Sequence, residues 1–410
     1  MKKFFALLLS LAMVLALVAC GQKDPTPDTP DTPDDPQTKV EYKVAMITDY
    51  GDITDQSFNQ TTYEACKAFA EDNSIEFSYF KPAGDNTADR VAMIEKAVDE
   101  GFNVIVMPGY AFGGAIVEAA PEFPDVKFIA LDVAAGDLLE TAVAKAGEAY
   151  DYTPENWDLN KYVDMSNVYC AVYQEELCGY MAGYAAVKLG YKNLGFLGGM
   201  SVPAVVRYGY GFVQGVDAAA ADLGLTDVKL NYIYGGQFFG DADITAVMDT
   251  WYQGGTEVVF ACGGGIYTSA VDAAKKANAK VIGVDVDQAG VIAKYAGVDG
   301  MTVTSAMKGL SPATYDTLTD VIVNGNWDKY VGKIATLGLV SGTDPEANYV
   351  QIPMGDGTQW SDSYTQDDYK AMVKDMFDGK ITVSNNTSSD VSAADFATVI
   401  TVDDQGSIKG

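Results

Sequence analysis

The chain has 410 residues, of which 57 are acidic and 27 are basic, so its formal net charge at pH 7 is −30. This charge argues against nucleic-acid binding, which needs clustered lysine and arginine to contact phosphates. The chain has no histidine, which excludes Ser-His-Asp and Cys-His catalysis and every metal site that depends on imidazole. Paired carboxylates or a Ser-Lys pair could still support catalysis, but we predict a protein that is not an enzyme and has no cofactor or metal ion.

The first residues have the pattern of an export signal. Lys2 and Lys3 precede an apolar run at 4–18, and the letters LVACG surround Cys20. The cysteine at this junction resembles the lipobox of bacterial lipoproteins, although an ordinary signal peptide could also end in cysteine. The run is shorter than the roughly 20 residues that span a bilayer. We therefore predict a signal peptide at 1–19, lipidation (palmitate) on Cys20, and an extracytoplasmic protein anchored to the cell membrane by lipid.

The segment at 20–40 follows this junction, and residues 22–38 read QKDPTPDTPDTPDDPQT. It has no large apolar side chain, so it does not bury enough surface to offset the entropy of ordering. Proline and like-charge repulsion favour an extended chain. We expect a disordered spacer between the lipid and the folded part.

From Val44 onward, short apolar runs alternate with segments of helical period. The predicted strands are Val44–Thr48, Ile75–Phe80, Val104–Met107, Val126–Leu131, Val168–Val172, Leu194–Leu197, Val228–Tyr234, Glu257–Ala261, Val281–Val284, Met301–Thr304 and Ile334–Leu339. The clearest helical segments between them are Ser57–Glu71, Thr87–Glu100, Gln174–Leu189, Arg207–Leu223 and Thr268–Ala277. Apolar strands that alternate with helices indicate parallel sheets covered on both faces.

The run of elements is too long for one sheet, so we predict an α/β protein with two doubly wound lobes. The first lobe is expected at 41–172, with a segment near 286–330 returning to it. The second lobe is expected at 173–285 and is completed by about 331–410. The segment beyond Gln351 is acidic and rich in Asn, Ser and Thr, and carries no functional prediction.

Four cysteines follow Cys20. Cys66 and Cys262 lie in apolar surroundings, and we predict that both are buried free thiols. Cys170 and Cys178 could form a disulfide only if the turn between them brings them close together.

Polar and glycine-rich loops follow several predicted strands. They are Asp49–Ser57, Pro108–Gly114, Asp132, Gly198-Gly199, Gly263–Gly265 and Asp285. Ligands of open parallel sheets bind at the carboxyl ends of the strands. Glycine and aspartate are also common in any tight turn, so no single loop is decisive, but the whole set favours a ligand-binding cleft.

Five segments resemble, in order, motifs of the basic membrane protein family, lipoprotein solute receptors of the purine nucleoside receptor type that serve ABC importers. They are TDYGDITDQSFNQ at 48–60, FIALD at 128–132, NLGFLGG at 193–199 with Gly211-Phe212 and Gly215 beyond, GVDVDQ at 283–288, and TSAMK at 304–308. The resemblance covers about 44–308.

The resemblance implies the type I periplasmic-binding-protein fold, with two lobes joined by three hinge crossovers. It also implies a nucleoside ligand, with a purine base stacked between aromatic rings, and ABC permease subunits and the membrane as partners of a monomeric protein. The ligand-binding residues implied by the matching motifs are Asp49, Phe58, Asn59, Asp132, Phe238, Gly263, Gly264, Asp285 and Lys308.

These residue types suit a nucleoside. Aromatic rings stack on a base, with roughly 1–3 kcal/mol per base. Asn59 can pair with the base edge, a carboxylate accepts from ribose hydroxyls, and Lys308 can keep that carboxylate ionised. Simpler roles exist for neighbouring residues: Ser57 could be only a helix cap, and Tyr208 and Tyr210 could be core or rim residues. Phe238 and Phe239 are adjacent, so the sequence leaves open which ring reaches the ligand.

Other functions fit parts of the sequence. Ser305-Ala306-Met307-Lys308 is an S-x-x-K, but its companion S-D-N and K-T-G motifs are absent and the serine ends a predicted strand. The glycines at 263–265 lack a phosphate-loop pattern. A receptor for a sugar or other small polar metabolite, or a ligand-sensing lipoprotein on the same fold, is the main alternative. The segment at 135–163 looks longer than the family requires, which bears on the ligand more than on the fold.

Overall fold

The computed structural model describes residues 41–409, and the residues from Tyr42 on form one compact unit. The predicted signal peptide, the lipidation of Cys20 and the spacer lie outside the described residues. None of the helices between residues 41 and 409 combines the length and the apolar character needed to cross a bilayer.

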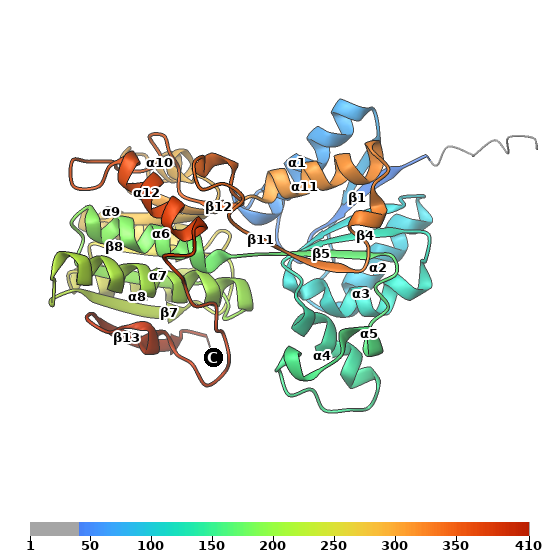
Figure 1. The fold of residues 1–410 in the computed structure, drawn as a ribbon, viewed down its shortest axis with the longest axis horizontal. Coiled ribbons are helices and arrows are strands. Elements are labelled where there is room, and N and C mark those ends of the chain that lie inside the picture. Colours follow the sequence, from blue (N-terminus) through green and yellow to red (C-terminus); the bar gives the residue numbers. More distant parts are fainter. Residues whose placement is uncertain (1–40, 410) are drawn as a thin grey trace, which may run out of the picture. The chain divides into compact units, whose positions relative to one another are not determined.

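The compact unit contains two α/β lobes, each built on its own sheet (Figure 1). The first sheet has the order β11-β5-β4-β3-β1-β2, and all its strand pairs are parallel. Its strands are β1 (Lys43–Ile47), β2 (Glu76–Phe80), β3 (Val104–Pro108), β4 (Lys127–Leu131), β5 (Val168–Tyr173) and β11 (Lys333–Leu337). The helices that belong to this lobe are α1 (Phe58–Asn73), α2 (Thr87–Asp99), α3 (Gly113–Ala119), α4 (Ala135–Lys145), α5 (Leu159–Tyr162) and α11 (Leu310–Leu318).

The second sheet has the order β12-β10-β9-β8-β6-β7-β13 and is parallel except for the short β12, which pairs antiparallel with β10. Its strands are β6 (Asn193–Gly198), β7 (Lys229–Tyr234), β8 (Val258–Cys262), β9 (Lys280–Asp285), β10 (Thr302–Lys308), β12 (Val350–Gln351) and β13 (Thr401–Ser407). Its helices are α6 (Glu175–Lys188), α7 (Pro203–Leu223), α8 (Ala242–Gln253), α9 (Tyr267–Ala277), α10 (Ala289–Ala296) and α12 (Gln366–Phe377).

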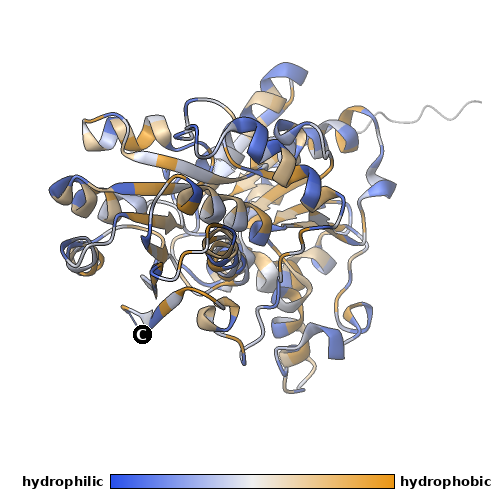
Figure 2. Cartoon of the chain, turned by 60° about the vertical axis from the view of Figure 1, so that its left-hand side comes forward, coloured by the Kyte–Doolittle hydropathy of each residue, from blue (hydrophilic) through white to orange (hydrophobic). Residues whose placement is uncertain are grey.

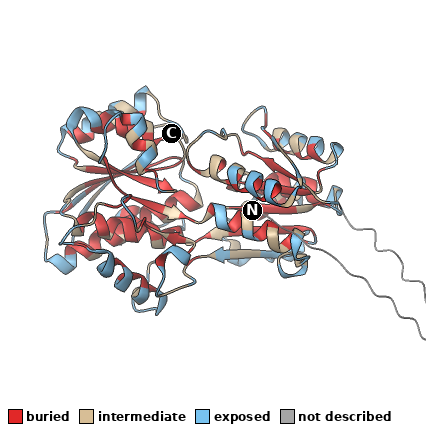
Figure 3. Cartoon of the chain, turned by 90° about the horizontal axis from the view of Figure 1, so that it is seen from above, coloured by how far each residue is buried: buried red, intermediate tan, exposed pale blue. Residues whose placement is uncertain are grey.

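The eleven predicted strands correspond to β1 through β11, and the prediction of two doubly wound parallel-sheet lobes is confirmed. In Figure 2 apolar residues concentrate along the central strands, and Figure 3 shows the same strands buried while the outward helix faces are exposed. The apolar core is therefore organised around each sheet, because strands covered on both faces bury nearly all their side chains.

The chain passes between the lobes three times, after β5, after β10 and after β11. The boundaries differ from the expected ones in two places. β10 lies in the second sheet, where its buried residues pair with β9, so the returning segment begins at α11 and not near residue 286. α11 packs against α1, and the returning segment ends with β11 in the first sheet. The second lobe is consequently completed from β12 onward, not from about residue 331.

All four described cysteines are buried and free. The prediction for Cys66 and Cys262 is confirmed. Cys170 and Cys178 do not form the disulfide that the sequence left open, because Cys170 on β5 packs into the core of the first lobe and Cys178 on α6 packs into a different apolar cluster. Burial raises the pKa of both thiols.

Helices α6 and α7 lie in backbone contact. A Cβ atom on any of four glycines would lie within 2.1–2.4 Å of a carbonyl oxygen of the facing helix, which is closer than real Cβ contacts allow. These glycines are Gly179 and Gly183 on α6 and Gly211 and Gly215 on α7. Glycine is required at these positions because a larger residue would push the two helices apart.

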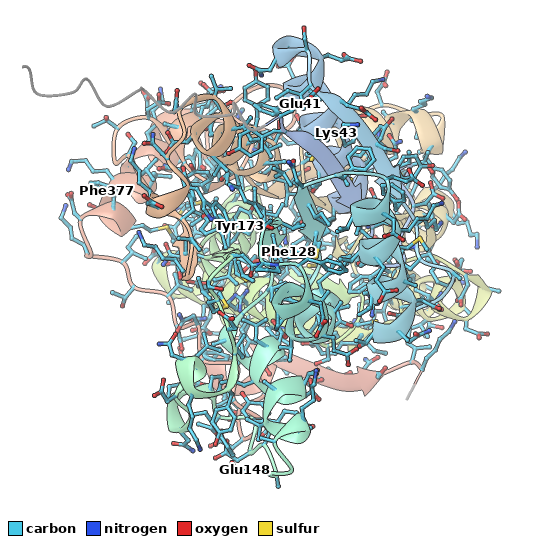
Figure 4. The ribbon with its side chains drawn as sticks, turned by 90° about the vertical axis from the view of Figure 1, so that its right-hand side faces the viewer. Glu41, Lys43, Phe128, Glu148, Tyr173 and Phe377 are labelled. Atoms are coloured by element: carbon cyan, nitrogen blue, oxygen red, sulfur yellow. The ribbon has the colours of Figure 1, made fainter. Side chains whose placement is uncertain are left out.

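The segment at 135–163 contains α4, α5 and the turns between them. Its aromatic rings contact one another: the centroids of Tyr150 and Trp157 are 5.7 Å apart, and those of Trp157 and Tyr162 are 5.5 Å apart. Figure 4 shows Glu148 at the far end of this segment, away from the interior where Phe128 and Tyr173 lie. Helix α4 packs into the core of the first lobe, whereas residues 146–162 are largely exposed, and no residue of the segment lines the cavity described next.

Candidate functional site

A cavity of about 390 Å³ lies between the two lobes. This volume falls within the roughly 300–1,000 Å³ that is usual for small-molecule sites. Its walls come from the carboxyl ends of β1–β4 and β7–β10 and from the starts of α1 and α7. All nine residues that the sequence implicated line this one cavity: Asp49, Phe58, Asn59, Asp132, Phe238, Gly263, Gly264, Asp285 and Lys308.

The start of α1 brings Phe58 and Asn59 to the cavity. The helix is capped by Asp55, whose carboxylate accepts from the backbone N–H groups of Asn59 (2.9 Å) and Gln60 (3.1 Å). Ser57 occupies the N-cap position but makes no capping hydrogen bond. Its hydroxyl instead donates to Oδ2 of Asp285 at 2.6 Å, across the cleft. The alternative that Ser57 is only a helix cap is therefore wrong.

Asn59 is buried and presents an unused acceptor. Its Nδ2 donates to Asp55 at 3.2 Å, while its Oδ1 is buried without a hydrogen-bond partner. The amide NH2 group of Asn59 must face the carboxylates of Asp55 and Asp49, because only this group can donate to them. Its Oδ1 therefore remains free to accept a hydrogen bond from another group. A buried acceptor without a partner costs stability, so this atom is suited to a donor on a ligand.

Asp49 follows β1, at the start of the loop that leads to α1, and is buried. Its Oδ1 accepts from the backbone N–H groups of Tyr50 (2.6 Å) and Gly51 (2.7 Å). Burial raises the pKa of Asp49, against these hydrogen bonds and the nearby Arg90. Arg90 also donates to the carbonyl oxygen of Asp49 at 3.1 Å, which fixes the end of the strand.

Asp132 and Asp285 occupy matching places in the two lobes. Asp132 follows β4 and Asp285 ends β9, and both have left-handed backbones, with φ of 60° and 64°. Such a conformation is uncommon outside glycine and aspartate tolerates it better than most residues. It turns both carboxylates into the cavity, where Oδ1 of Asp132 is buried without a partner.

Lys308 joins the two lobes electrostatically. Its Nζ lies 2.5 Å from Asp132, 3.6 Å from Glu175 and 3.7 Å from Asp285, and only 5% of the residue is exposed. Burial alone would lower the pKa of Lys308, but these carboxylates raise it above its ordinary value. The ammonium also lies 4.6 Å from the ring centroid of Phe58, at cation–π distance.

Glu175 and Arg207 extend this charge cluster and were not predicted. Arg207 Nε donates to Glu175 Oε2 at 2.7 Å, and Glu175 is fully buried. Burial raises the pKa of Glu175, and Arg207 and Lys308 oppose that shift. A glutamate in the first turn of a helix usually faces solvent, so the sequence held no signal that this one is buried at a crossover between lobes.

Of the two adjacent rings, Phe238 is more tightly packed than Phe239. A Cβ on Gly199 would lie 2.3 Å from the Phe238 ring, and one on Gly263 would lie 2.8 Å from it, so the ring packs directly on two glycine backbones. Gly263 has φ of 145° and Gly264 has φ of 48°, conformations that favour glycine. Phe239 also lines the cavity but is 56% exposed.

Tyr208 reaches the cavity, unlike Tyr210. Tyr208 lines the wall and its hydroxyl donates to Oδ1 of Asp285 at 3.2 Å, whereas the hydroxyl of Tyr210 donates to the carbonyl of Val391 at 2.9 Å in the core. Sequence reasoning also missed an apolar wall from the start of α7. This wall consists of Val202, Ala204 and Val205.

Comparison with known proteins agrees with this geometry. A family model described as "Bmp: ABC transporter substrate-binding protein PnrA-like" matches residues 42–343. The chain is 26% identical over 392 residues to the "ABC transporter nucleoside-binding protein BmpA" of Lactococcus lactis subsp. cremoris (strain MG1363), covering 92% of this chain and 96% of that protein. It is 26% identical over 320 residues to an uncharacterized lipoprotein of Pyrococcus abyssi (strain GE5 / Orsay), covering 74% and 69%.

Among solved structures, an ABC transporter system solute-binding protein from Aeropyrum pernix K1 aligns with a TM-score of 0.63 at 20% identity, covering 85% of this chain and 95% of that one. This similarity confirms the predicted solute-binding-protein fold. The family match confirms the resemblance found in the sequence motifs and extends it in both directions. Because the match covers well over half of the chain, the protein belongs to the Bmp family of PnrA-like ABC transporter substrate-binding proteins and is a binding protein, not an enzyme.

Proposed function

We propose that the protein binds a nucleoside with a purine base in the cavity between its lobes and delivers it to the permease of an ABC importer. The observation that carries this proposal is the pairing of aromatic rings from opposite lobes with unpaired buried acceptors. Phe58 comes from the first lobe and Phe238 from the second, and both line the cavity. The unpaired acceptors are Oδ1 of Asn59 and Oδ1 of Asp132.

The rings account for the base. A purine presents two flat apolar faces, and stacking on an aromatic side chain contributes roughly 1–3 kcal/mol per base. Phe238 is held against Gly199 and Gly263, so little conformational entropy is lost when it meets a ligand. Asn59 Oδ1 then accepts from an N–H group on the base edge.

The charged residues account for the sugar. Vicinal ribose hydroxyls donate to carboxylates, and Asp132 and Asp285 offer one carboxylate from each lobe. Lys308 lies between them, pairs with both carboxylates, and can donate a hydrogen bond to a sugar oxygen. A ligand that contacts both lobes at once favours the conformation in which the lobes are closed around it, as expected for a receptor that closes by a hinge motion.

The name of the Lactococcus relative supports the nucleoside assignment, since it identifies nucleosides as the ligand of that protein. A sugar receptor on the same fold is the alternative. Such a receptor needs carboxylates and amides but not an aromatic ring from each lobe, and the two phenylalanines therefore favour the nucleoside.

We further propose that the protein acts outside the cytoplasm as a monomer, tethered to the membrane by lipid on Cys20. The name of the Pyrococcus relative, a lipoprotein, supports the tether. The lipobox-like sequence around Cys20 supports it independently. Mass spectrometry of the membrane fraction tests it: a diacylglycerol-modified Cys20 at the mature N-terminus is expected, and an unmodified cysteine would contradict it.

Calorimetric titration tests which ligand the protein binds. The unit from residue 40 onward, refolded to remove bound ligand, is titrated with inosine, guanosine, adenosine, cytidine and ribose. Tight binding of the purine nucleosides with no binding of ribose is expected. Phe58→Ala should weaken binding at least about tenfold, which is 1.4 kcal/mol, whereas Phe377→Ala, a half-exposed ring on α12 outside the cavity lining, should not. If none of the five compounds binds, the proposal of a nucleoside ligand is contradicted, and the sugar receptor or ligand sensor is favoured.

A further inference from the structure

The tail segment, defined here as residues 391–409, lies outside the residues that the family model matches. It is fastened to the second lobe by Asp217, whose carboxylate accepts from the backbone N–H groups of Thr398 (2.8 Å), Val399 (2.8 Å) and Ile400 (3.2 Å). Beyond these residues, β13 pairs in parallel with β7 at the edge of the sheet (Figure 1).

The end of the tail segment reaches the loop that carries Phe238. This loop, residues 235–241, connects β7 to α8 and is called the Phe238 loop below. The backbone N–H of Ile408 donates to the carbonyl of Tyr234 at 2.8 Å. The ammonium of Lys409 donates to Oε1 of Gln237 at 2.8 Å and to the carboxylate of Asp241. Lys409 therefore bridges the two sides of the loop.

The backbone and the polar side chains of the Phe238 loop pack closely around Lys409. Gly236 has φ of 80°, and a Cβ there would lie 2.7 Å from the carbonyl oxygen of Lys409. Asp241 accepts from the backbone N–H of Ile244 at 2.9 Å and so caps α8. Gln237 Nε2 donates to the same carboxylate at 3.0 Å. The lysine thus completes a network that includes the first turn of α8.

The opposite side of the loop faces the cavity. There the carbonyl of Phe238 accepts from the N–H of Gly265 at 2.9 Å, and the ring packs on Gly199 and Gly263. The loop is consequently held from two sides, by the β8–α9 glycines within the cavity and by the tail segment outside it.

We propose that the tail segment, through Lys409, holds the Phe238 loop in its ligand-binding position, so that Lys409 is a positioning residue of the binding site. The role of Phe238 in this inference rests on the proposed function. An exposed ion pair changes an equilibrium constant by up to roughly fivefold, which sets the size of the effect.

The test compares Lys409→Met and Lys409→Arg with wild type. Lys374→Met is the matched control, because Lys374 on α12 forms a 2.7 Å ion pair with Asp378 at the C-cap of that helix and does not contact the loop. Hydrogen–deuterium exchange of the Phe238 loop is measured without ligand, and the Kd for inosine is measured by calorimetry. Lys409→Met should exchange about threefold to fivefold faster in the loop and raise the Kd by about the same factor. Lys409→Arg should restore both values, and Lys374→Met should leave both at wild type.

The two readouts separate this inference from the proposed function. If wild type does not bind inosine, the nucleoside assignment fails, while faster loop exchange in Lys409→Met still supports the positioning role. Unchanged loop exchange in Lys409→Met overturns the inference whatever the affinity. Faster exchange with an unchanged Kd overturns the link between the loop and binding.

Discussion

Replacing Lys308 by methionine tests the charge cluster at the centre of the site. The substitution keeps much of the side-chain volume but removes the only ammonium that the described structure places among Asp132, Asp285 and Glu175. Breaking a buried ion pair by removing one partner costs about 3–5 kcal/mol, because the other charge is left uncompensated. We expect a loss of this size in the free energy of unfolding of the ligand-free protein at pH 8.

The loss should depend on pH. Burial already raises the pKa of Glu175, and Lys308 is one of the groups that oppose this shift. Without the ammonium, the pKa of Glu175 in the folded state should rise further above its value in the unfolded state. A group with a raised folded pKa contributes stability at low pH and loses it as pH rises through that pKa. The variant should therefore be destabilised less at pH 5 than at pH 8, relative to wild type.

Urea unfolding at both pH values measures this difference. The control is Lys276→Met, which removes an exposed lysine that forms a 2.7 Å ion pair with Asp249 and should cost no more than about 1 kcal/mol. A cost of less than about 1 kcal/mol for Lys308→Met at pH 8, or an equal cost at pH 5, would contradict the stabilising role assigned to the Lys308 ammonium.

Two further substitutions address the cavity and the core. Asp285→Ala removes the acceptor of Ser57 and Tyr208 and should weaken nucleoside binding by more than about 1.4 kcal/mol, or tenfold, in calorimetry; unchanged affinity in both this variant and Phe58→Ala would exclude the assigned site. Burial raises the pKa of Glu176 from 4.5 to about 7, so wild type should lose stability relative to Glu176→Gln as pH rises from 5 to 7, by about 1.4 kcal/mol per pH unit. Urea unfolding at pH 5, 6 and 7 measures this, and parallel pH profiles for the two proteins would contradict the burial argument.

The parts of the site that the sequence predicted share one physical signal. Asp49, Asp132 and Asp285 follow apolar strands, and parallel strands bring their carboxyl ends to the same edge of a sheet. The resemblance to the family then indicated Phe58, Asn59, Phe238 and Lys308, among many similar residues, as candidates for ligand binding. The cavity lining includes all of them, while their part in binding stays a prediction.

The parts that the sequence did not predict depend on tertiary packing. Glu175 and Arg207 pair at a crossover between lobes, and no local pattern shows that a charged residue in a first helical turn is buried. β13 reads TVDDQGS, without the apolar alternation of a strand, and is held by pairing with β7. The returning segment expected near 286–330 includes β10, but β10 lies in the second sheet, because a strand's sheet is decided by its partner, here β9, and not by its own sequence.

The backbone contact between α6 and α7 changes how the family motif at 193–215 should be understood. Gly211 and Gly215 belong to that motif, yet each faces a carbonyl oxygen of α6, of Glu176 and Tyr180 respectively, and neither lines the cavity. Receptors with different ligands would need the same two glycines for as long as these helices stay in contact. The presence of these two glycines therefore reflects the packing of α6 on α7, and solute preference must be traced through the residues of the cavity wall.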